Sequence, residues 1–188
     1  MNGLLKLALL AAFALASISS TQAADSFKID PVHSSIHFKV QHFGAGFTIG
    51  RFDKIGGTMT LDGDKSAVSI TAEADSIDTN EPKRDEHLKG ADFFNAKEFP
   101  KINFTSTGVK KTGEKTYEIS GEFALAGVKK SLTFTATQVG EAKGFKGERL
   151  VGFEAVFTIN RLDYGVKYAP DKLGTDVVLT IEIEAIGQ

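Results

Sequence analysis

The sequence has 188 residues and a formal net charge of −2, with 22 lysines and arginines against 24 aspartates and glutamates. This balance lacks the excess of basic residues that a nucleic-acid-binding surface requires, so we expect no nucleic-acid partner. The absence of cysteine excludes disulfides and thiol redox chemistry. With 15 phenylalanines and no tryptophan, the chain must gain its stability from an apolar core that has few polar handles.

The first 23 residues predict an export signal rather than part of the fold. Lys6 precedes an apolar run at residues 7–16, and Thr-Gln-Ala at residues 21–23 fits a small-x-small cleavage site. The apolar run is too short to span a bilayer, which needs ~20 residues. We therefore expect a periplasmic protein with one domain at residues 24–188.

Period-2 alternation of apolar and polar residues predicts about eight strands. A glycine at position 121 predicts a bulge or bend within one of them. One apolar and one polar face on nearly every strand indicate an all-β, antiparallel sheet, which either stacks as a sandwich or closes into a barrel; we favour the barrel. In chain order the segments are residues 34–41, 56–63, 66–74, 100–106, 116–127, 131–138, 152–160 and 176–186.

Residues 76–100 interrupt the strand pattern with a dense run of charged residues and two prolines. We expect a short helical cap near residues 81–98, with Asn80 or Glu81 at its N-cap. The segment also carries phenylalanines that need a place to bury, and one end of the barrel is the natural place. These residues are Phe93, Phe94 and Phe99.

Four stretches of the sequence resemble the YceI-like family. They span nearly all of residues 24–188, in the family's order and spacing. The resemblance implies an extended, lipocalin-like antiparallel barrel that holds a long polyisoprenoid or an isoprenoid quinone. The stretches are DPVHSSIHFKVQHFG from Asp30, SIDTNEPKRDEHLKGADFFNAKEFPKINFTS from Ser76, GFEAVFTINRLDYGV from Gly152 and GTDVVLTIEIEA from Gly174.

One strand departs from the family's pattern. The family usually has G-x-L-T-L-x-G, whereas this chain has GEFALAG, with Phe123 and Ala124 where the family has leucine and threonine. If this strand lines the tunnel, the length or headgroup of the preferred ligand would differ from the family's, while the fold would remain.

The resemblance favours a lipid tunnel over a filled core, although the strand pattern alone leaves both open. The charged residues of the cap have two possible roles. They could form a polar rim that meets a lipid headgroup, or an ion pair that fixes the cap, with Arg161 or Asp163 as its partner. We favour the ion pair for Asp85. By strand parity the lining candidates are Phe38, Val40, Phe104, Ile119, Phe134, Phe157 and Leu179. The cap and mouth candidates are Arg84, Asp85, His87, Phe93, Phe94 and Phe99.

Metal binding and hydrolysis are the competing chemistries. His33, His37 and His42 are close in sequence, but His42 falls on the other face of a strand, so three ligands would not converge. Asp30, His33 and Ser34 suggest a hydrolase, yet neighbouring side chains on an extended segment point to opposite faces. We expect no metal site and no catalytic residue. The simpler role of Asp30 is to accept hydrogen bonds from backbone N–H groups in a turn.

We therefore expect a non-enzymatic carrier of an isoprenoid lipid, without a required cofactor, that stores, protects or transfers the lipid in the periplasm. A membrane or a membrane redox protein would be a transient partner, and the oligomeric state is open, with a dimer as one alternative. Two other functions also stay open. One is a metal- or histidine-dependent enzyme or redox accessory protein, and the other is a stress-response module with a filled core and no ligand.

Overall fold

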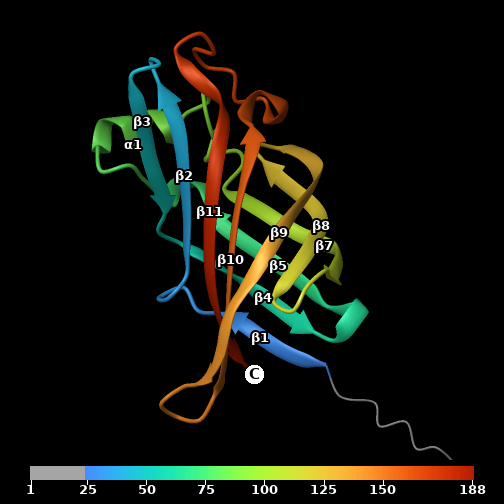
Figure 1. Cartoon of the computed structure of the whole chain (residues 1–188). Helices are drawn as coiled ribbons and strands as arrows, with labels where there is room; N and C mark the ends of the chain where they lie inside the picture. The colour runs from blue at the N-terminus through green and yellow to red at the C-terminus, as the bar shows by residue number, and fades with distance from the viewer. Residues whose placement is uncertain (1–23) are drawn as a thin grey trace, which may run out of the picture.

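The computed structural model describes residues 24–188, and their architecture follows from one antiparallel sheet that closes on itself (Figure 1). The expected export signal at residues 1–23 lies outside the described residues. The strands are β1 (Asp25–Ile29), β2 (Ser35–His42), β3 (Gly46–Phe52), β4 (Ile55–Leu61), β5 (Ala67–Glu73), β6 (Ile77–Asp78), β7 (Lys101–Lys111), β8 (Thr116–Leu125), β9 (Val128–Lys143), β10 (Arg149–Asn160) and β11 (Leu173–Gly187). One α-helix, α1 (Pro82–Lys89), and three short 3₁₀ turns, Gly63–Lys65, Ala74–Ser76 and Arg161–Tyr164, complete the fold. No helix among the described residues has the length and apolar character needed to cross a membrane.

Eight strands form a closed antiparallel barrel, in the order β1-β4-β5-β7-β8-β9-β10-β11, because β1 pairs with both β4 and β11. This confirms the predicted all-β barrel. The sequence pattern includes residues 34–41 among its strands and omits residues 25–29. In the structure the omitted segment, β1, closes the barrel, whereas the included segment, β2, lies outside the closed ring.

The strand β11 has two successive partners along one of its edges. Its C-terminal end pairs with β1, with Ala185 opposite Ile29, and its N-terminal part pairs with β2, with Leu179 opposite Phe38. The strands β3 and β6 continue the sheet beyond β2. We call β2, β3 and β6 the flap. The helix α1 and the turns after it lie beside the flap (Figure 1) and confirm the predicted cap near residues 81–98.

The end of the barrel where β1 pairs with β11 is filled with apolar side chains. Phe27 and Ile29 from β1 pack there with Val151 and Ala185 from β10 and β11, and all four are at most 2% exposed. Each full burial of such a side chain contributes about 1.5–3 kcal/mol. This end of the barrel is therefore a packed core, and the larger internal space lies towards the flap.

The predicted irregularity near Gly121 involves two paired strands. The ring of Phe104 lies directly over Gly121, where a Cβ atom would come within 2.5 Å of it. The extra residue of the bulge lies on the partner strand β7, because Ser106 pairs with Gly121 and Gly108 with Ser120, which leaves Thr107 between them. The glycine makes room for the ring, and the bulge re-aims the strand opposite.

We expect the substitution Phe27→Ala to lower the free energy of unfolding by about 3–5 kcal/mol, because it opens a cavity in the filled end of the barrel. The control is Phe145→Ala, since Phe145 is fully exposed in the β9–β10 turn and its loss should change stability by less than about 0.5 kcal/mol. Urea unfolding followed by circular dichroism measures both. Equal losses in the two variants would contradict a core at this end.

Candidate functional site

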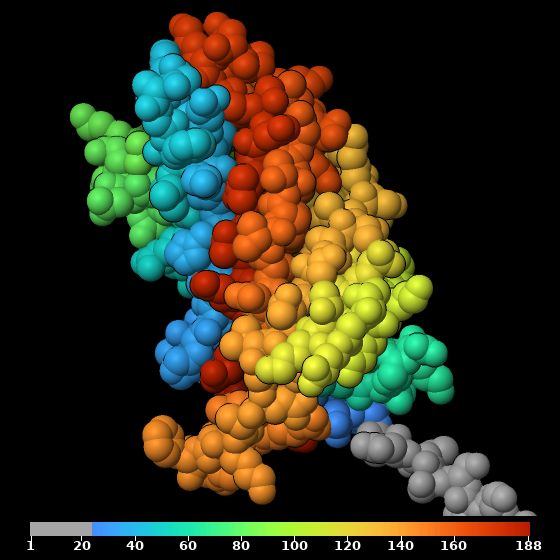
Figure 2. All heavy atoms as spheres, viewed as in Figure 1, coloured from blue at the N-terminus to red at the C-terminus, as the bar shows by residue number. Residues whose placement is uncertain are grey.

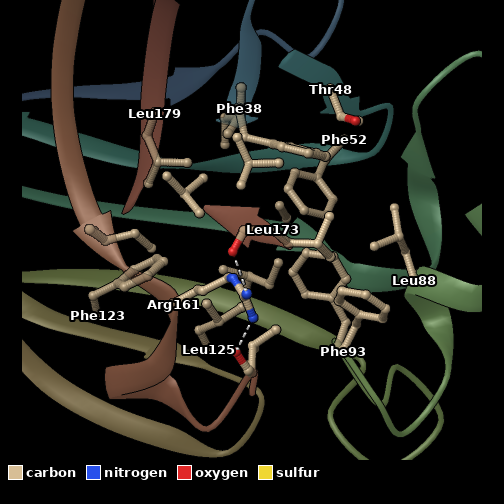
Figure 3. A pocket seen from close by; sticks show the side chains of 18 of the residues that line it. Phe38, Thr48, Phe52, Leu88, Phe93, Phe123, Leu125, Arg161, Leu173 and Leu179 are labelled. Carbon is tan, nitrogen blue, oxygen red and sulfur yellow. Dashed lines mark hydrogen bonds between the residues drawn. The ribbon is translucent and has the colours of Figure 1, made fainter. Parts of the chain in front are cut away.

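A cavity of about 450 Å³ lies inside the half of the barrel that faces the flap. Its wall is mostly apolar and is built from the flap, β5, β7 to β11 and the cap (Figure 3). Cavities of this size lie within the range of small-molecule sites, roughly 300–1,000 Å³. In Figure 3 Phe38, Phe52, Phe123 and Leu179 point towards the same space from different strands.

Six of the seven predicted lining residues lie in the wall of this cavity. They are Phe38, Val40, Phe104, Phe134, Phe157 and Leu179. The seventh, Ile119, instead lines a second cavity of about 60 Å³ nearer the filled end. Strand parity places Ile119 on the inner face correctly, but parity does not say how far along the barrel a residue lies.

Three residues line both cavities and form the floor that separates them: Ile70, Phe134 and Ile181. The ring of Phe134 stacks on Phe157 with a centroid distance of 4.5 Å and an interplanar angle of 17°. It also contacts Phe104, at 5.2 Å. These packed aromatic rings limit the depth that a ligand can reach from the flap side.

The phenylalanines of the cap do not act as one group. Phe93 and Phe94 line the cavity, and Phe94 packs edge-on against Phe52 at 5.7 Å. Phe99 does not line the cavity; its ring lies against Gly127 in the β8–β9 turn, where a Cβ atom would be 2.5 Å away. The expectation that all three close the cavity is therefore correct for two of them, because Phe99 fixes the end of the cap to the barrel instead.

The buried carboxylate of Asp85 fixes the cap through a threonine that the sequence did not single out. Its Oδ1 accepts hydrogen bonds from the backbone N–H and the hydroxyl of Thr79. Arg84 donates from Nε to Oγ1 of Thr79 and from its terminal nitrogen to the Thr79 carbonyl, both at 2.7 Å. The expected ion pair between the charged residues of the cap and Arg161 or Asp163 is thus wrong. Asp85 bonds to Thr79, Arg161 donates to backbone carbonyl groups, and Asp163 pairs with Lys130 at 3.3 Å.

Arg161 is a buried cation in the cavity wall, only 5% exposed. Its guanidinium donates to the carbonyl oxygens of Gly174 at 2.8 Å, Val166 at 2.7 Å and Leu173 at 3.0 Å. Figure 3 shows the bond to Leu173. Burial lowers the pKa of the guanidinium, but an arginine remains a cation in a protein. Arg161 therefore holds the segment before β11 in place while it presents a positive charge to the cavity.

The cavity opens where its wall residues become exposed. These residues are His42, Phe43, Arg84, His87, Tyr168 and Lys172. They come from the β2–β3 turn, the helix α1 and the segment at residues 166–172, and we call this opening the mouth. The rings of His87, Phe93 and Tyr168 lie about 5 Å from one another and join the cap to the segment at 166–172.

The Asp30, His33 and Ser34 group lies away from the cavity, at the point where the chain passes from β1 to β2. His33 Nδ1 donates to Asp30 Oδ2 at 2.7 Å, and Asp30 Oδ1 accepts from the Val32 backbone at 2.9 Å. Ser34 exchanges two hydrogen bonds with the backbone of Glu184, at 3.0 and 3.1 Å. These contacts attach the β1–β2 connection to β11, so the group holds the fold at its branch point.

Potential metal ligands meet at the same point. Within residues 24–188, the one group of three such side chains is Asp30, His33 and Glu184, whose ligand atoms lie within 4.8 Å of one another. The imidazole is already hydrogen-bonded to Asp30. The three histidines considered from the sequence do not meet: His42 lies at the mouth, far along β2 from His33.

Several residues of the site were not selected from the sequence. Strand parity could have identified Phe123 and Leu125, because both continue the inner face of their strand into the cavity wall. Thr79, Tyr168 and the lining role of Arg161 carry no such signal, because their positions depend on turns that follow a strand or helix. Phe123 is also where the strand departs from the family's pattern, so the departure alters the wall of the cavity.

We expect Arg161→Met to lower the free energy of unfolding by about 3 kcal/mol or more, because one buried and two partly buried carbonyl groups lose their donor. Arg51→Met is the matched control. Arg51 is half exposed and pairs with Asp53 and Asp78, so its loss should cost less than about 1 kcal/mol. Thermal unfolding measures both, and equal shifts would contradict this role of Arg161.

The hydrogen bond between His33 and Asp30 raises the pKa of His33 above 6.5 and lowers the pKa of Asp30 below 3.8. The pair should therefore stabilise the fold fully between pH 3.8 and pH 6.5, the ordinary pKa values of the two groups. This contribution is lost as the pH rises through the raised pKa of His33, and also as the pH falls through the lowered pKa of Asp30. In an NMR titration, Asp30→Asn should return the pKa of His33 towards 6.5, whereas Asp53→Asn should leave it unchanged; an unaltered pKa in Asp30→Asn would refute the pairing.

Comparison with known proteins agrees with this geometry. The model of the YceI-like domain matches residues 27–185. Protein YceI of Escherichia coli O157:H7 is 37% identical over 177 residues, which cover 92% of each chain. Among solved structures, BcnA of Burkholderia cenocepacia superposes with a TM-score of 0.75 at 18% identity, covering 83% of this chain and 98% of its own. A polyisoprenoid binding domain from Saccharophagus degradans superposes with a TM-score of 0.70 at 14% identity, covering 86% and 98%. The two superpositions support the fold, and the matches in sequence show that the chain belongs to the YceI-like domain family.

Proposed function

We propose that this protein binds a long isoprenoid lipid, either a polyisoprenoid or an isoprenoid quinone, and stores, protects or transfers it in the periplasm without catalysis. The observation that carries the proposal is the apolar cavity of about 450 Å³, which is closed at the filled end of the barrel and open at the mouth. The isoprenoid chain would occupy the cavity, and its polar end would lie at the mouth. No further cofactor is part of the proposal.

The physical chemistry of the wall suits such a ligand. Each buried CH₂ group contributes about 0.8 kcal/mol, so a chain of several isoprene units binds tightly without directed polar contacts. Methyl-branched chains also pack well against aromatic rings, which the wall supplies from Phe38, Phe104, Phe134 and Phe157. The superposition on a domain described as polyisoprenoid binding supports this class of ligand.

The polar groups of the wall are concentrated where the proposal places the headgroup. Arg84, His87 and Lys172 lie at the mouth, and Arg161 lies deeper in the wall. All are donors that suit the carbonyl oxygens of a quinone or the phosphate oxygens of a polyprenyl phosphate. The apolar floor at Phe134 offers no such partner, so the ligand enters with its hydrocarbon end first.

An enzymatic function finds less support in the structure. The Asp30, His33 and Ser34 group lies outside the cavity wall, and the Ser34 hydroxyl is occupied by the Glu184 backbone. A nucleophilic serine needs a hydrogen bond to its base and access to a substrate. We therefore assign this group to the fold and the cavity to the function.

The first test is mass spectrometry of an organic extract from protein that is exported by cells and purified without detergent. An isoprenoid lipid at about one equivalent per chain is the expected result and would give its length and headgroup directly. An empty extract, together with no uptake of added quinone, would overturn the proposal.

The substitution Phe157→Asp places a charge in the cavity wall and should lower the bound isoprenoid by about tenfold or more, because a carboxylate against an apolar chain loses its hydration. Val156→Asp is a matched control, since Val156 precedes Phe157 on β10 but is 64% exposed on the outer face. Phe157→Trp serves as a second variant, because it fills the cavity without adding charge. His33→Ala should keep the lipid; loss of lipid in His33→Ala but not in Phe157→Asp or Phe157→Trp would favour a histidine-dependent function.

A further inference from the structure

Three large apolar side chains are exposed together on the flap. Phe43 lies in the β2–β3 turn, and Phe47 and Ile49 lie on the outer face of β3; they are 60%, 63% and 60% exposed. Register places Phe47 opposite Gln41 and Ile49 opposite Lys39, which confirms the outward face. Single exposed apolar residues are normal, but three large ones on one turn and strand next to a cavity opening indicate an interaction surface.

Three lysines lie on or beside the elements that carry this apolar group. Lys39 Nζ lies 4.9 Å from the centre of the Phe47 ring, and Lys167 and Lys172 are exposed on the neighbouring segment. Within residues 24–188, none of the ion pairs involves these three lysines. The segment contributes one acidic residue, Asp171, so the surface has a net positive charge on a chain whose formal net charge is −2.

The same surface is continuous with the mouth. The backbone N–H of Phe43 donates to the Lys172 carbonyl at 2.7 Å, which joins the β2–β3 turn to the segment at 166–172. Figure 2 shows these two segments side by side at one end of the molecule, while the β9–β10 turn projects from the other end. Phe43 also adopts a positive φ of 52°, a conformation that is rare for a bulky side chain.

We propose that this surface docks the protein on an anionic phospholipid bilayer, with Phe43, Phe47 and Ile49 entering the interfacial region and the lysines contacting lipid headgroups. We call these residues, with Lys39, Lys167 and Lys172, the docking patch. Exposed aromatic and aliphatic side chains with lysines beside them match the chemistry of a peripheral membrane contact. The proposal rests on the proposed function, because docking would place the mouth against the reservoir of an isoprenoid lipid and let the lipid pass without crossing water.

A protein partner fits the patch less well. Lysines are depleted from the centres of protein interfaces, whereas here Lys39 lies directly over the apolar group. A bilayer also requires no shape complementarity, which agrees with side chains that project separately. The membrane source is therefore the one we test, and a protein partner is an outcome that would overturn it.

The test is flotation with vesicles of phosphatidylcholine, with and without phosphatidylglycerol. We expect the protein to float with the anionic vesicles and to be released by salt, because headgroup contacts are screened. The double variant Phe47→Ser and Ile49→Ser should lower vesicle affinity about tenfold or more, because two side chains no longer enter the interface. Neither residue lines the cavity, so the bound isoprenoid should be unchanged. Phe145→Ser, a fully exposed phenylalanine at the opposite end, is the control and should float as the unmodified protein does.

Each outcome separates the two proposals. Flotation that Phe47→Ser and Ile49→Ser abolish, with the isoprenoid retained, supports docking. An unmodified protein that carries an isoprenoid but does not float with anionic vesicles overturns docking, favours a protein partner, and leaves the proposed function intact. Flotation of a protein whose extract is empty and which takes up no added quinone would overturn the proposed function instead. Equal loss in Phe145→Ser, or equal binding to neutral vesicles, would also overturn the docking patch.

Discussion

The fold depends on the two partners that β11 holds on one edge. Its C-terminal end pairs with β1, which closes the barrel, and its N-terminal part pairs with β2, which leads the sheet out into the flap. An eight-stranded barrel has room only for its own side chains or for one slim ligand. Because β11 branches, this molecule has both a filled half and a hollow half. Phe27 and its neighbours fill the closed end, and the flap widens the other end around a cavity.

The branch leaves backbone groups without partners in the sheet, and nearby side chains supply the missing hydrogen bonds. At the branch the chain passes from β1 to β2, and both strands pair with β11. Backbone groups in this connection would therefore lack hydrogen-bond partners in the sheet. Asp30 satisfies the Val32 N–H, and Ser34 takes up both polar groups of the Glu184 backbone. The motif that suggests a hydrolase in the sequence thus supplies hydrogen bonds at an irregular point in a sheet. Its histidine adds a charged hydrogen bond to the same turn.

The sequence predicts which side chains point into the barrel better than it predicts where along the barrel they lie. Alternation identified the inner face of β2, β10 and β11, and hence Phe38, Phe157 and Leu179, because side chains alternate strictly along a strand. It did not reveal β1, which is only five residues long and places just two large apolar side chains, Phe27 and Ile29, on its inner face. It also placed Ile119 in the main cavity, because depth along a barrel depends on strand stagger. The partner of Asp85 was missed for a related reason: Thr79 comes close only after the chain turns between β6 and α1.

The charged segment between β6 and β7 follows from the same geometry. In the flap, β3 lies away from the closed barrel. The opening beside it must be covered by a segment that is polar on its outer side and apolar on its inner side. Residues 82–89 form a helix that is exposed on most of its surface, and Leu88, Phe93 and Phe94 reach inwards to the cavity. The hydrogen bonds of Asp85 and Arg84 to Thr79 fix this cover to β6, not to the barrel wall. The cap therefore needs no polar anchor in the barrel wall, and the wall of the cavity stays mostly apolar, with Arg161 as its buried cation.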